Sequence, residues 1–235
     1  MIEFSFPEIK QIALEDEIIN RLKNAIVTGK FAPGAYLNES EIAKQMALSR
    51  IPIREAIKKL EQEGLVFRKP NKGVYVIIFT EQDVREIFSL RAKLESMAFE
   101  WAIPNMGTDD IEQLRKIIVM QQTALMEKKY DELARLDMQF HEFICLKAGH
   151  SRLLKAWYEQ HAQAQMLLNL RFSHLSYYTP DTVPIDHLKI LETMERGDIA
   201  SAVALTNEIG ERVSSECVKS LAEFTAITEA EHHSA

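Results

Sequence analysis

The chain has 235 residues, of which 46% are hydrophobic and 27% charged, a composition typical of a soluble protein with one large or two small domains. It contains no run of 18 apolar residues, and its first ten residues lack the apolar segment of a signal peptide, so we expect neither a membrane span nor export. The two cysteines, Cys145 and Cys217, have no metal-finger spacing, which favours a reducing, cytoplasmic compartment.

The formal net charge of −7 is unevenly distributed along the chain. Residues 1–78 carry 12 Lys+Arg against 10 Asp+Glu, whereas residues 79–235 carry 16 against 25. A basic patch on an acidic protein is typical of a nucleic-acid contact, and the alternative is a solvated surface face. Within 44–72 only three acidic residues accompany eight basic ones: Lys44, Arg50, Arg54, Lys58, Lys59, Arg68, Lys69 and Lys72.

Three helices are predicted in the first third of the chain. Apolar residues at helical spacing predict the first over about 11–28. A short helix that includes residues 42–46 follows. Ser49 is a favourable N-cap for a third helix over 50–63, and Gly64 is the glycine expected after its last turn.

The hydrophobic period changes after this third helix. Residues 65–68 and 74–78 are rich in β-branched and aromatic side chains, and the Lys-Pro-Asn-Lys-Gly segment between them forms a turn, so a β-hairpin is predicted. Three helices followed by a basic-tipped hairpin make a winged helix-turn-helix, in which the second helix of the motif enters the major groove. Residues 1–78 are therefore predicted to form a DNA-binding domain.

From Thr80 onward the pattern is helical almost to the end. A linker over 79–82 is expected to precede an all-helical domain over 83–228 and a frayed tail over 229–235, with a loop at Tyr177–Pro184. The predicted fold class is mainly α: an N-terminal winged helix-turn-helix followed by an all-helical bundle. The predicted helices of the bundle span 81–103, 109–128, 131–148, 151–172, 184–196 and 198–225.

The third helix has an apolar face and a basic face. The basic face presents Arg50, Arg54 and Lys58 at i, i+4 and i+8. An arginine can pair two donors with guanine O6 and N7 or bind a phosphate, and the helix N-terminus adds N–H donors for phosphate. The other candidate DNA contacts are Lys44 and, at the hairpin tip, Lys69, Lys72 and Gly73.

The run PGAYLNESEIAKQMALSRIPIREAIKKLEQEGLVFRKPNKGVYV resembles the N-terminal domain of the GntR family of bacterial regulators, and the resemblance covers residues 10–78. It implies homodimers that bind palindromic operators in double-stranded DNA, usually as repressors of a metabolic operon. The matching elements are Pro33-Gly34, Leu37, Glu41-Ile42-Ala43, Ser49-Arg50, Pro52, Arg54-Glu55-Ala56, Leu60, Glu63-Gly64-Leu65 and Gly73-Val74-Tyr75-Val76.

This resemblance also implies individual roles. Arg50 and Arg54 would contact bases or phosphates, Ser49 would contact the DNA backbone, and Gly73 would let the wing approach closely. The chain departs from the family pattern at two positions: Ala47 stands where glycine is common, and Ile51 stands where threonine is common. The Ile51 side chain could read a thymine methyl group, so both departures bear on the operator sequence.

The helical part resembles the FCD effector domain of the FadR-like branch of that family, over nearly all of 83–213. Many members of this branch bind a divalent metal through one Asp and three His and respond to a small molecule such as an organic acid. The resemblance assigns Asp137, His141 and His187 as ligands. The matching residues are Leu90-Arg91, Leu94-Glu95, Ala98, Asp137, Phe140, His141, Asp186-His187, Ile190, Gly197-Asp198 and Ala202.

The spacing of the first two ligands is favourable, because Asp137 and His141 are four residues apart and point from one helix face into the bundle. His187 would approach from another helix. The family's last histidine falls on Ile209, so the set is incomplete. Three ligands could still hold Zn²⁺, Ni²⁺ or Mn²⁺, with water or effector in the gap. The alternatives are a metal-free variant and histidines that are simply hydrogen-bonded in the core.

Arg91 has two interpretations: it could pair with the carboxylate of an effector, or with Glu95 one turn further along its helix. Two other functions remain open at this point. One is a metal-dependent enzyme on the helical bundle, in which the Asp/His cluster activates a water. The other is a structural nucleoid protein. No nucleophile motif, glycine-rich phosphate loop or HExxH motif is present, so we expect no catalytic residues and no enzyme.

Overall fold

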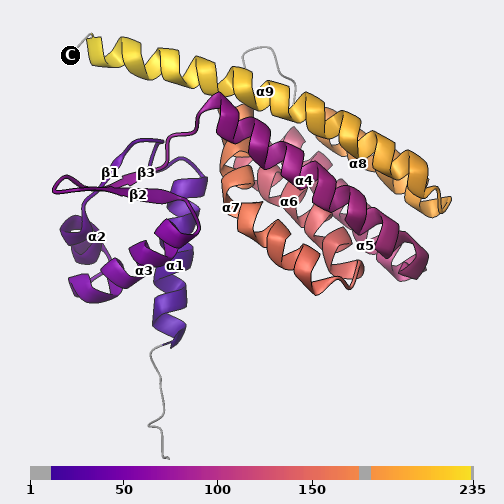
Figure 1. Ribbon diagram of the computed structural model, residues 1–235, viewed down its shortest axis with the longest axis horizontal. Coiled ribbons are helices and arrows are strands. Elements are labelled where there is room, and N and C mark those ends of the chain that lie inside the picture. Colours follow the sequence, from indigo (N-terminus) through magenta and orange to yellow (C-terminus); the bar gives the residue numbers. More distant parts are fainter. Residues whose placement is uncertain (1–11, 175–180, 234–235) are drawn as a thin grey trace, which may run out of the picture. The chain divides into compact units, whose positions relative to one another are not determined.

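The computed structural model of the protein describes residues 12–174 and 181–233 and divides into two units, residues 1–78 and 79–235, which we describe separately. Figure 1 traces both units. The first unit contains, in order, α1 (Ile12–Val27), β1 (Tyr36–Leu37), α2 (Glu39–Gln45), α3 (Arg50–Gln62), β2 (Val66–Lys69) and β3 (Gly73–Val76).

The first unit is a winged helix-turn-helix. Its sheet is antiparallel with the strand order β1-β3-β2, and Phe67 on β2 lies opposite Tyr75 on β3. The sequence pattern predicted the β2–β3 hairpin but not β1, which has only two residues and pairs with the far edge of β3. The core between α1 and α3 is fully buried and consists of Ile18, Leu22, Ile26, Ile53, Ile57 and Leu60.

Local signals set the ends of the motif helices. The Asn38 side chain accepts hydrogen bonds from the backbone N–H groups of Ser40 and Glu41 and so caps α2. Ser49 occupies the predicted N-cap position of α3, although its hydroxyl makes no capping hydrogen bond. Between the two helices, Ala47 has a φ of 54°, in the left-handed region that favours glycine.

The second unit is a helical bundle. Its helices are α4 (Glu81–Ala102), the 3₁₀ helix η1 (Ile103–Asn105), α5 (Thr108–Met126), α6 (Tyr130–Lys147), α7 (Ser151–His174), α8 (Thr182–Glu195) and α9 (Ile199–His233). Helix α4 packs against α6, α7 and α9, and Figure 1 shows α4 and α9 lying side by side along the bundle. Where these two helices cross, a Cβ atom on Gly210 would lie 3.2 Å from that of Ala92, so glycine permits the close approach.

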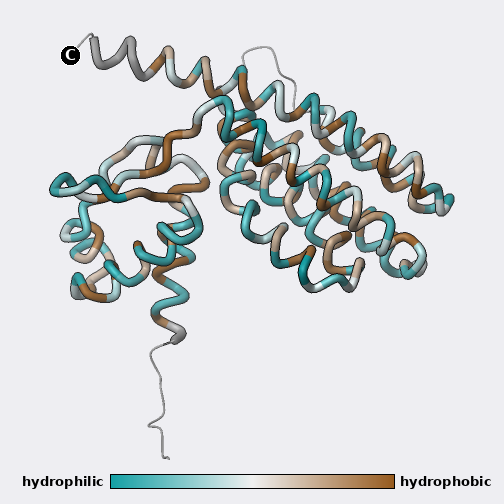
Figure 2. The backbone as a smooth tube through the Cα atoms, in the orientation of Figure 1, coloured by the Kyte–Doolittle hydropathy of each residue, from teal (hydrophilic) through white to brown (hydrophobic). Residues whose placement is uncertain are grey.

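Hydrophobic and hydrophilic segments alternate along the helices in Figure 2, as expected for helices with one apolar face. Two helix ends differ from the sequence prediction. Helix α8 begins at Thr182 because Pro184 is tolerated in the first turn, where its missing N–H is not needed. Helix α9 continues to His233, past the predicted end at 225 and into the predicted tail, because no glycine or proline follows Gly210.

Part of the predicted loop at Tyr177–Pro184 lies outside the described residues, as do residues 234–235 of the tail. None of the described helices combines the length and the apolar composition needed to cross a membrane.

Replacing Ala47 by glycine should stabilise the protein. An L-residue in the left-handed region destabilises the folded state by roughly 1–2 kcal/mol. Glycine removes that strain, but its greater freedom in the unfolded chain lowers stability by about 0.5–1 kcal/mol. Since Ala47 is exposed and loses no packing, we expect Ala47→Gly to raise the free energy of unfolding by up to about 1 kcal/mol, measured by urea denaturation followed by circular dichroism.

The matched control is Ala222→Gly, the same change at an exposed position inside α9, where it should destabilise by about 0.5–1 kcal/mol. Destabilisation by both variants would show that Ala47 is not strained.

Candidate functional site

The first candidate surface is the exposed side of α3. Arg50, Arg54 and Lys58 lie on it, and their side chains are 59%, 49% and 54% exposed. The opposite side of the same helix carries the buried residues of the core. Local geometry explains this division, because positions four residues apart share one face of a helix. The described part of α3 therefore presents a row of three cations to solvent.

Other sequence-predicted contacts are also accessible. Ile51 is 73% exposed. Lys58 pairs with Glu55 at 2.8 Å. Four further candidates, Ser49, Lys44, Lys69 and Lys72, are exposed.

Packing in the wing involves two of the predicted contact residues. Lys69 Nζ lies over the Tyr75 ring, 4.6 Å from its centroid. Gly73 has a φ of 100°, and a Cβ atom there would lie 2.5 Å from the Tyr36 ring. Packing against Tyr36 therefore requires glycine at position 73, whether or not the wing approaches DNA closely.

Sequence reasoning missed Glu39, the first residue of α2, on which three arginines converge. Arg54 donates to Glu39 Oε2 from Nε at 3.2 Å and from Nη2 at 3.1 Å. Arg50 Nη2 lies 3.6 Å from the same oxygen, and Arg68 Nη1 lies 3.8 Å from Oε1. These contacts join α3, α2 and strand β2 of the wing. No local pattern reveals them, because Arg54 and Glu39 are 15 positions apart on different helices.

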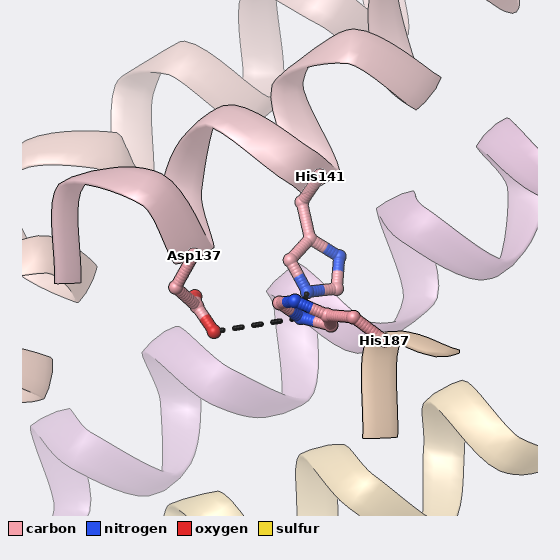
Figure 3. A group of neighbouring side chains, drawn as sticks. All are labelled: Asp137, His141 and His187. Carbon is pink, nitrogen blue, oxygen red and sulfur yellow. Dashed lines mark hydrogen bonds and ion pairs between the residues drawn. The ribbon is translucent and has the colours of Figure 1, made fainter. Parts of the chain in front are cut away.

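The second candidate site is a buried cluster of Asp137, His141 and His187, shown in Figure 3. The first two project from α6, and His187 projects toward them from α8. Their ligand atoms all lie within 4.8 Å of one another. The two Nε2 atoms are 3.2 Å apart, and His187 Nε2 is 3.6 Å from Asp137 Oδ1. The structure thus brings together the three residues that the sequence singled out.

Neighbouring side chains fix the tautomer of His187. Gln121 donates from Nε2 to the Leu136 carbonyl at 3.1 Å, which turns its Oε1 toward His187 Nδ1 at 3.0 Å. Because an amide oxygen only accepts, His187 Nδ1 must carry the proton. Burial lowers the pKa of His187 to about 3, despite the opposing effect of the Asp137 carboxylate, so its imidazole is neutral near pH 7 and its Nε2 bears a lone pair.

His141 is oriented in a similar way. Its Nδ1 lies 2.9 Å from Glu95 Oε2, although the contact lacks the alignment of a hydrogen bond. A lone pair at that distance from a carboxylate would be repelled, so Nδ1 carries the proton here too and Nε2 faces His187. Two Nε2 atoms and the Asp137 carboxylate therefore face one another as acceptors, and only a cation or a shared proton among them removes the repulsion.

Arg91 on α4 holds the cluster from one side. It donates from Nε to Glu95 Oε1 at 2.6 Å and from Nη2 to Asp137 Oδ2 at 3.2 Å, so the predicted ion pair with Glu95 is present and a second one accompanies it. Trp157 Nε1 also donates to Glu95 Oε1, at 3.1 Å. One arginine therefore faces two buried carboxylates beside the neutral His187.

The pKa values follow from these contacts. Burial tends to raise the pKa of Asp137 and of Glu95, but the Arg91 guanidinium and the facing histidines together hold both below their usual values. For Arg91 itself, burial tends to lower the pKa, but the two carboxylates outweigh burial and raise it. Both carboxylates and the guanidinium are therefore charged near neutral pH, as a buried ion pair must be to remain paired.

A small cavity adjoins the cluster, with about 40 Å³ of free space, enough for about three water molecules. Arg171 lines it and is 1% exposed, and it is paired with Glu216 through Nε at 2.8 Å and Nη2 at 2.5 Å. The sequence did not single out Arg171, whose partner lies 45 positions away. The rest of the lining is polar at Asp186 and Thr206 and otherwise consists of Phe88, Ala92, Leu168, Val183, Ile190, Ile209, Gly210 and Val213.

Ile209 faces this cavity, where the family pattern places a fourth histidine. Its neighbours on α9 do not substitute for it. Asn207 donates to Ser96 Oγ and the Val203 carbonyl and accepts from Lys93, and Glu208 is exposed. Among the described residues, the group that could hold a metal ion consists of three side chains.

Two family models match the chain: bacterial regulatory proteins of the gntR family over residues 14–76, and the FCD domain over residues 86–212. A similar relative is the HTH-type transcriptional regulator YdhC of Bacillus subtilis, 31% identical over 185 residues that cover 77% of this chain and 80% of the relative. The gluconate operon transcriptional repressor of the same species is 33% identical over 136 residues, 58% of this chain and 56% of the relative.

The HTH-type transcriptional repressor RspR of Escherichia coli is 27% identical over 185 residues, 79% of this chain and 80% of that protein. Among solved structures, Escherichia coli McbR/YncC has a TM-score of 0.78 at 19% identity, over 89% of this chain and 99% of that one. A GntR regulator from Rhodococcus has a TM-score of 0.77 at 20% identity, over 88% and 98%. These structural likenesses show the fold.

A winged helix-turn-helix followed by a helical bundle with a buried polar cluster is the architecture of a DNA-binding transcriptional regulator. The chain belongs to the GntR family of bacterial regulatory proteins and carries an FCD domain, consistent with the FadR-like branch. Like these relatives, it is a transcriptional regulator and not an enzyme.

Breaking the buried contacts of Arg91 should destabilise the bundle strongly. Arg91→Met leaves two buried carboxylates without their counter-charge, so we expect a decrease of about 3–5 kcal/mol in the free energy of unfolding. Both tryptophans, Trp101 and Trp157, lie in this unit, so urea denaturation followed by tryptophan fluorescence reports on it directly.

The matched control is Arg85→Met on the same helix, where the ion pair with Glu81 is exposed and should contribute less than about 1 kcal/mol. Equal decreases for the two variants would show that the buried ion pairs of Arg91 do not hold the cluster.

Proposed function

We propose that this regulator binds palindromic operator DNA as a homodimer, and that a small organic acid bound beside a metal ion in the helical bundle controls that binding. The observation that carries the DNA-binding part is the row of three exposed cations on α3, opposite a fully buried face. A regulator of this kind acts in the cytoplasm, where the DNA of a bacterium lies.

The proposed DNA contacts follow from the exposure of each residue. Arg50, Arg54 and Lys58 enter the major groove with α3 and reach guanine edges or phosphates, and Ile51 packs against a thymine methyl group. Ser49 stands at the N-terminus of the helix, where backbone N–H groups favour phosphate. Further backbone contacts come from Lys44 and from the wing residues Lys69, Lys72 and Gly73.

Dimerisation and repression are supported by the family. Winged-helix and helix-turn-helix dimers read two half-sites about one helical turn of DNA, roughly 34–36 Å, apart, so a two-fold dimer requires a palindromic operator. Two of the relatives are named as repressors, one of the gluconate operon. We therefore propose that this chain represses a metabolic operon.

The cluster of Asp137, His141 and His187 fits a divalent metal ion. His187 Nδ1 is hydrogen-bonded to Gln121 and His141 Nδ1 lies beside Glu95, which resembles the way in which metal-binding histidines are held, and three acceptors face one another. Imidazole and carboxylate ligands suit Zn²⁺, Ni²⁺ or Mn²⁺. When bound, the metal supplies positive charge and open coordination positions, and Ile209 contributes no ligand.

The effector is proposed to be a small organic acid. The cavity is small, and Arg91 and Arg171 are the two guanidiniums that line it. Either can offer charge-assisted hydrogen bonds to a carboxylate, although both are already paired with protein carboxylates. Because two buried carboxylates, Glu95 and Asp137, lie at the cluster, a bound cation would favour an anionic effector beside them. Binding then shifts the population of conformations that fit the operator.

Removing a proposed DNA contact should weaken binding and reduce its dependence on salt. We expect Arg54→Ala and Arg50→Ala each to cost about 1–3 kcal/mol on a duplex from upstream of the gene, measured by gel shift over a range of salt concentrations. For each phosphate that is no longer neutralised, the slope of log K against log salt should become shallower by about 0.9.

Arg135→Ala serves as the control, since Arg135 is an exposed arginine of α6 paired with Glu132 and outside the winged helix. If both α3 variants bind as tightly as the control, α3 is not the recognition helix.

Metal binding should depend on the cluster. We expect one Zn²⁺, Ni²⁺ or Mn²⁺ per chain by isothermal titration calorimetry, and loss of binding in His187→Ala and in the near-isosteric Asp137→Asn. Acetate, used as a small probe carboxylate, should raise the unfolding temperature only when metal is present, because a ligand at 100 times its Kd adds about 2.7 kcal/mol of stability.

His150→Ala is the matched control, since His150 lies outside the cluster and contacts Trp101. Unchanged titration curves in both cluster variants would place any bound metal elsewhere.

A further inference from the structure

We propose that Glu39 is a positioning residue for DNA recognition: its carboxylate, which Arg50 and Arg68 also approach, orients the guanidinium of Arg54 and thereby sets the base preference of the protein. The inference rests on the proposed DNA contacts of Arg50 and Arg54. It assigns a role to a residue that makes no DNA contact itself.

The first argument is the difference in burial between Glu39 and the three arginines. The Glu39 side chain is 13% exposed, whereas those of Arg50, Arg54 and Arg68 are 59%, 49% and 42% exposed. The carboxylate therefore lies beneath the three guanidiniums, which stand between it and solvent. A DNA duplex that meets this surface meets the arginines and not the carboxylate.

The second argument concerns the contacts of Arg54. Both Nε and Nη2 donate to the same Glu39 oxygen, at 3.2 and 3.1 Å, so two points on one edge of the planar guanidinium are fixed. Guanine recognition requires the plane of the guanidinium to match the plane of the base. A guanidinium that is already oriented loses less rotamer freedom on binding than one that is free.

The third argument concerns charge, because the Glu39 carboxylate reduces the affinity of this surface for DNA. The Glu39 carboxylate lowers the positive charge of the arginine group by one, beside the contact of Arg68 with Glu61 at 3.9 Å, and this weakens the attraction for any phosphate backbone. Removing the carboxylate should therefore strengthen non-specific binding while it weakens base discrimination. A carboxylate that only screened charge, or only held the fold together, would not move these two quantities in opposite directions.

The test uses the full-length protein and Glu39→Gln. Preferred duplexes are selected from a randomised DNA library, and affinities are measured for the selected duplex and for a scrambled one at several salt concentrations. We expect the specificity ratio to fall about tenfold, with preference reduced mainly at the base pairs that Arg54→Ala also affects. Affinity for the scrambled duplex should be unchanged or several-fold tighter.

The matched control is Glu41→Gln, which makes the same change of charge on the same helix. Glu41 is exposed and accepts a hydrogen bond from Gln45, not from an arginine. We expect this variant to keep the base preference of the original protein. Glu39→Asp, which keeps the charge, should recover part of the preference that Glu39→Gln loses. The unfolding temperature is recorded for every variant.

The inference is overturned if Glu39→Gln and Glu41→Gln have the same base preference, or if the only effect at Glu39 is a lower unfolding temperature with an unchanged specificity ratio. Failure of the proposed DNA contacts has a different signature. In that case the unaltered protein selects no sequence, or Arg54→Ala keeps the selected one, whatever happens at Glu39.

Discussion

The helical unit depends on one buried interaction, the pairing of Arg91 with Glu95 and Asp137. Helix α4 alone could not keep a guanidinium away from water, because the desolvation of a charge is repaid only by close partners. The same Glu95 carboxylate then faces His141 and accepts from Trp157, so one residue of α4 reaches both α6 and α7. The orientation of the histidine cluster follows from that network.

The winged unit also pairs arginines with a carboxylate, but its arginines are exposed to solvent. Its arginines remain largely exposed around the covered Glu39 carboxylate, so their ion pairs add little to stability but restrict where the guanidiniums point. In the bundle the guanidinium is buried, and its removal leaves unpaired charges. Burial therefore decides whether an arginine–carboxylate contact stabilises a fold or prepares a surface for a ligand.

Local sequence signals predicted most of the fold, because each is settled within a few residues. The change of period after Gly64 marked the wing, and the four-residue spacing of Asp137 and His141 placed both on one face of α6. Strand β1 was missed because two residues form a strand only through their partner β3. Partners such as Gln121 for His187, 66 positions away, could not be predicted, since they exist only once the helices pack.

The cluster and the winged unit are linked covalently through α4. Helix α4, which carries Arg91 and Glu95, begins at Glu81, only a short segment after β3 ends at Val76. A capping box between Thr80 and Asp83 fixes that helix start. If an effector binds in the cavity as proposed above, a change in the pairing of Arg91 would act on α4, and residues 77–80 would be the direct connection from that helix to the wing strand.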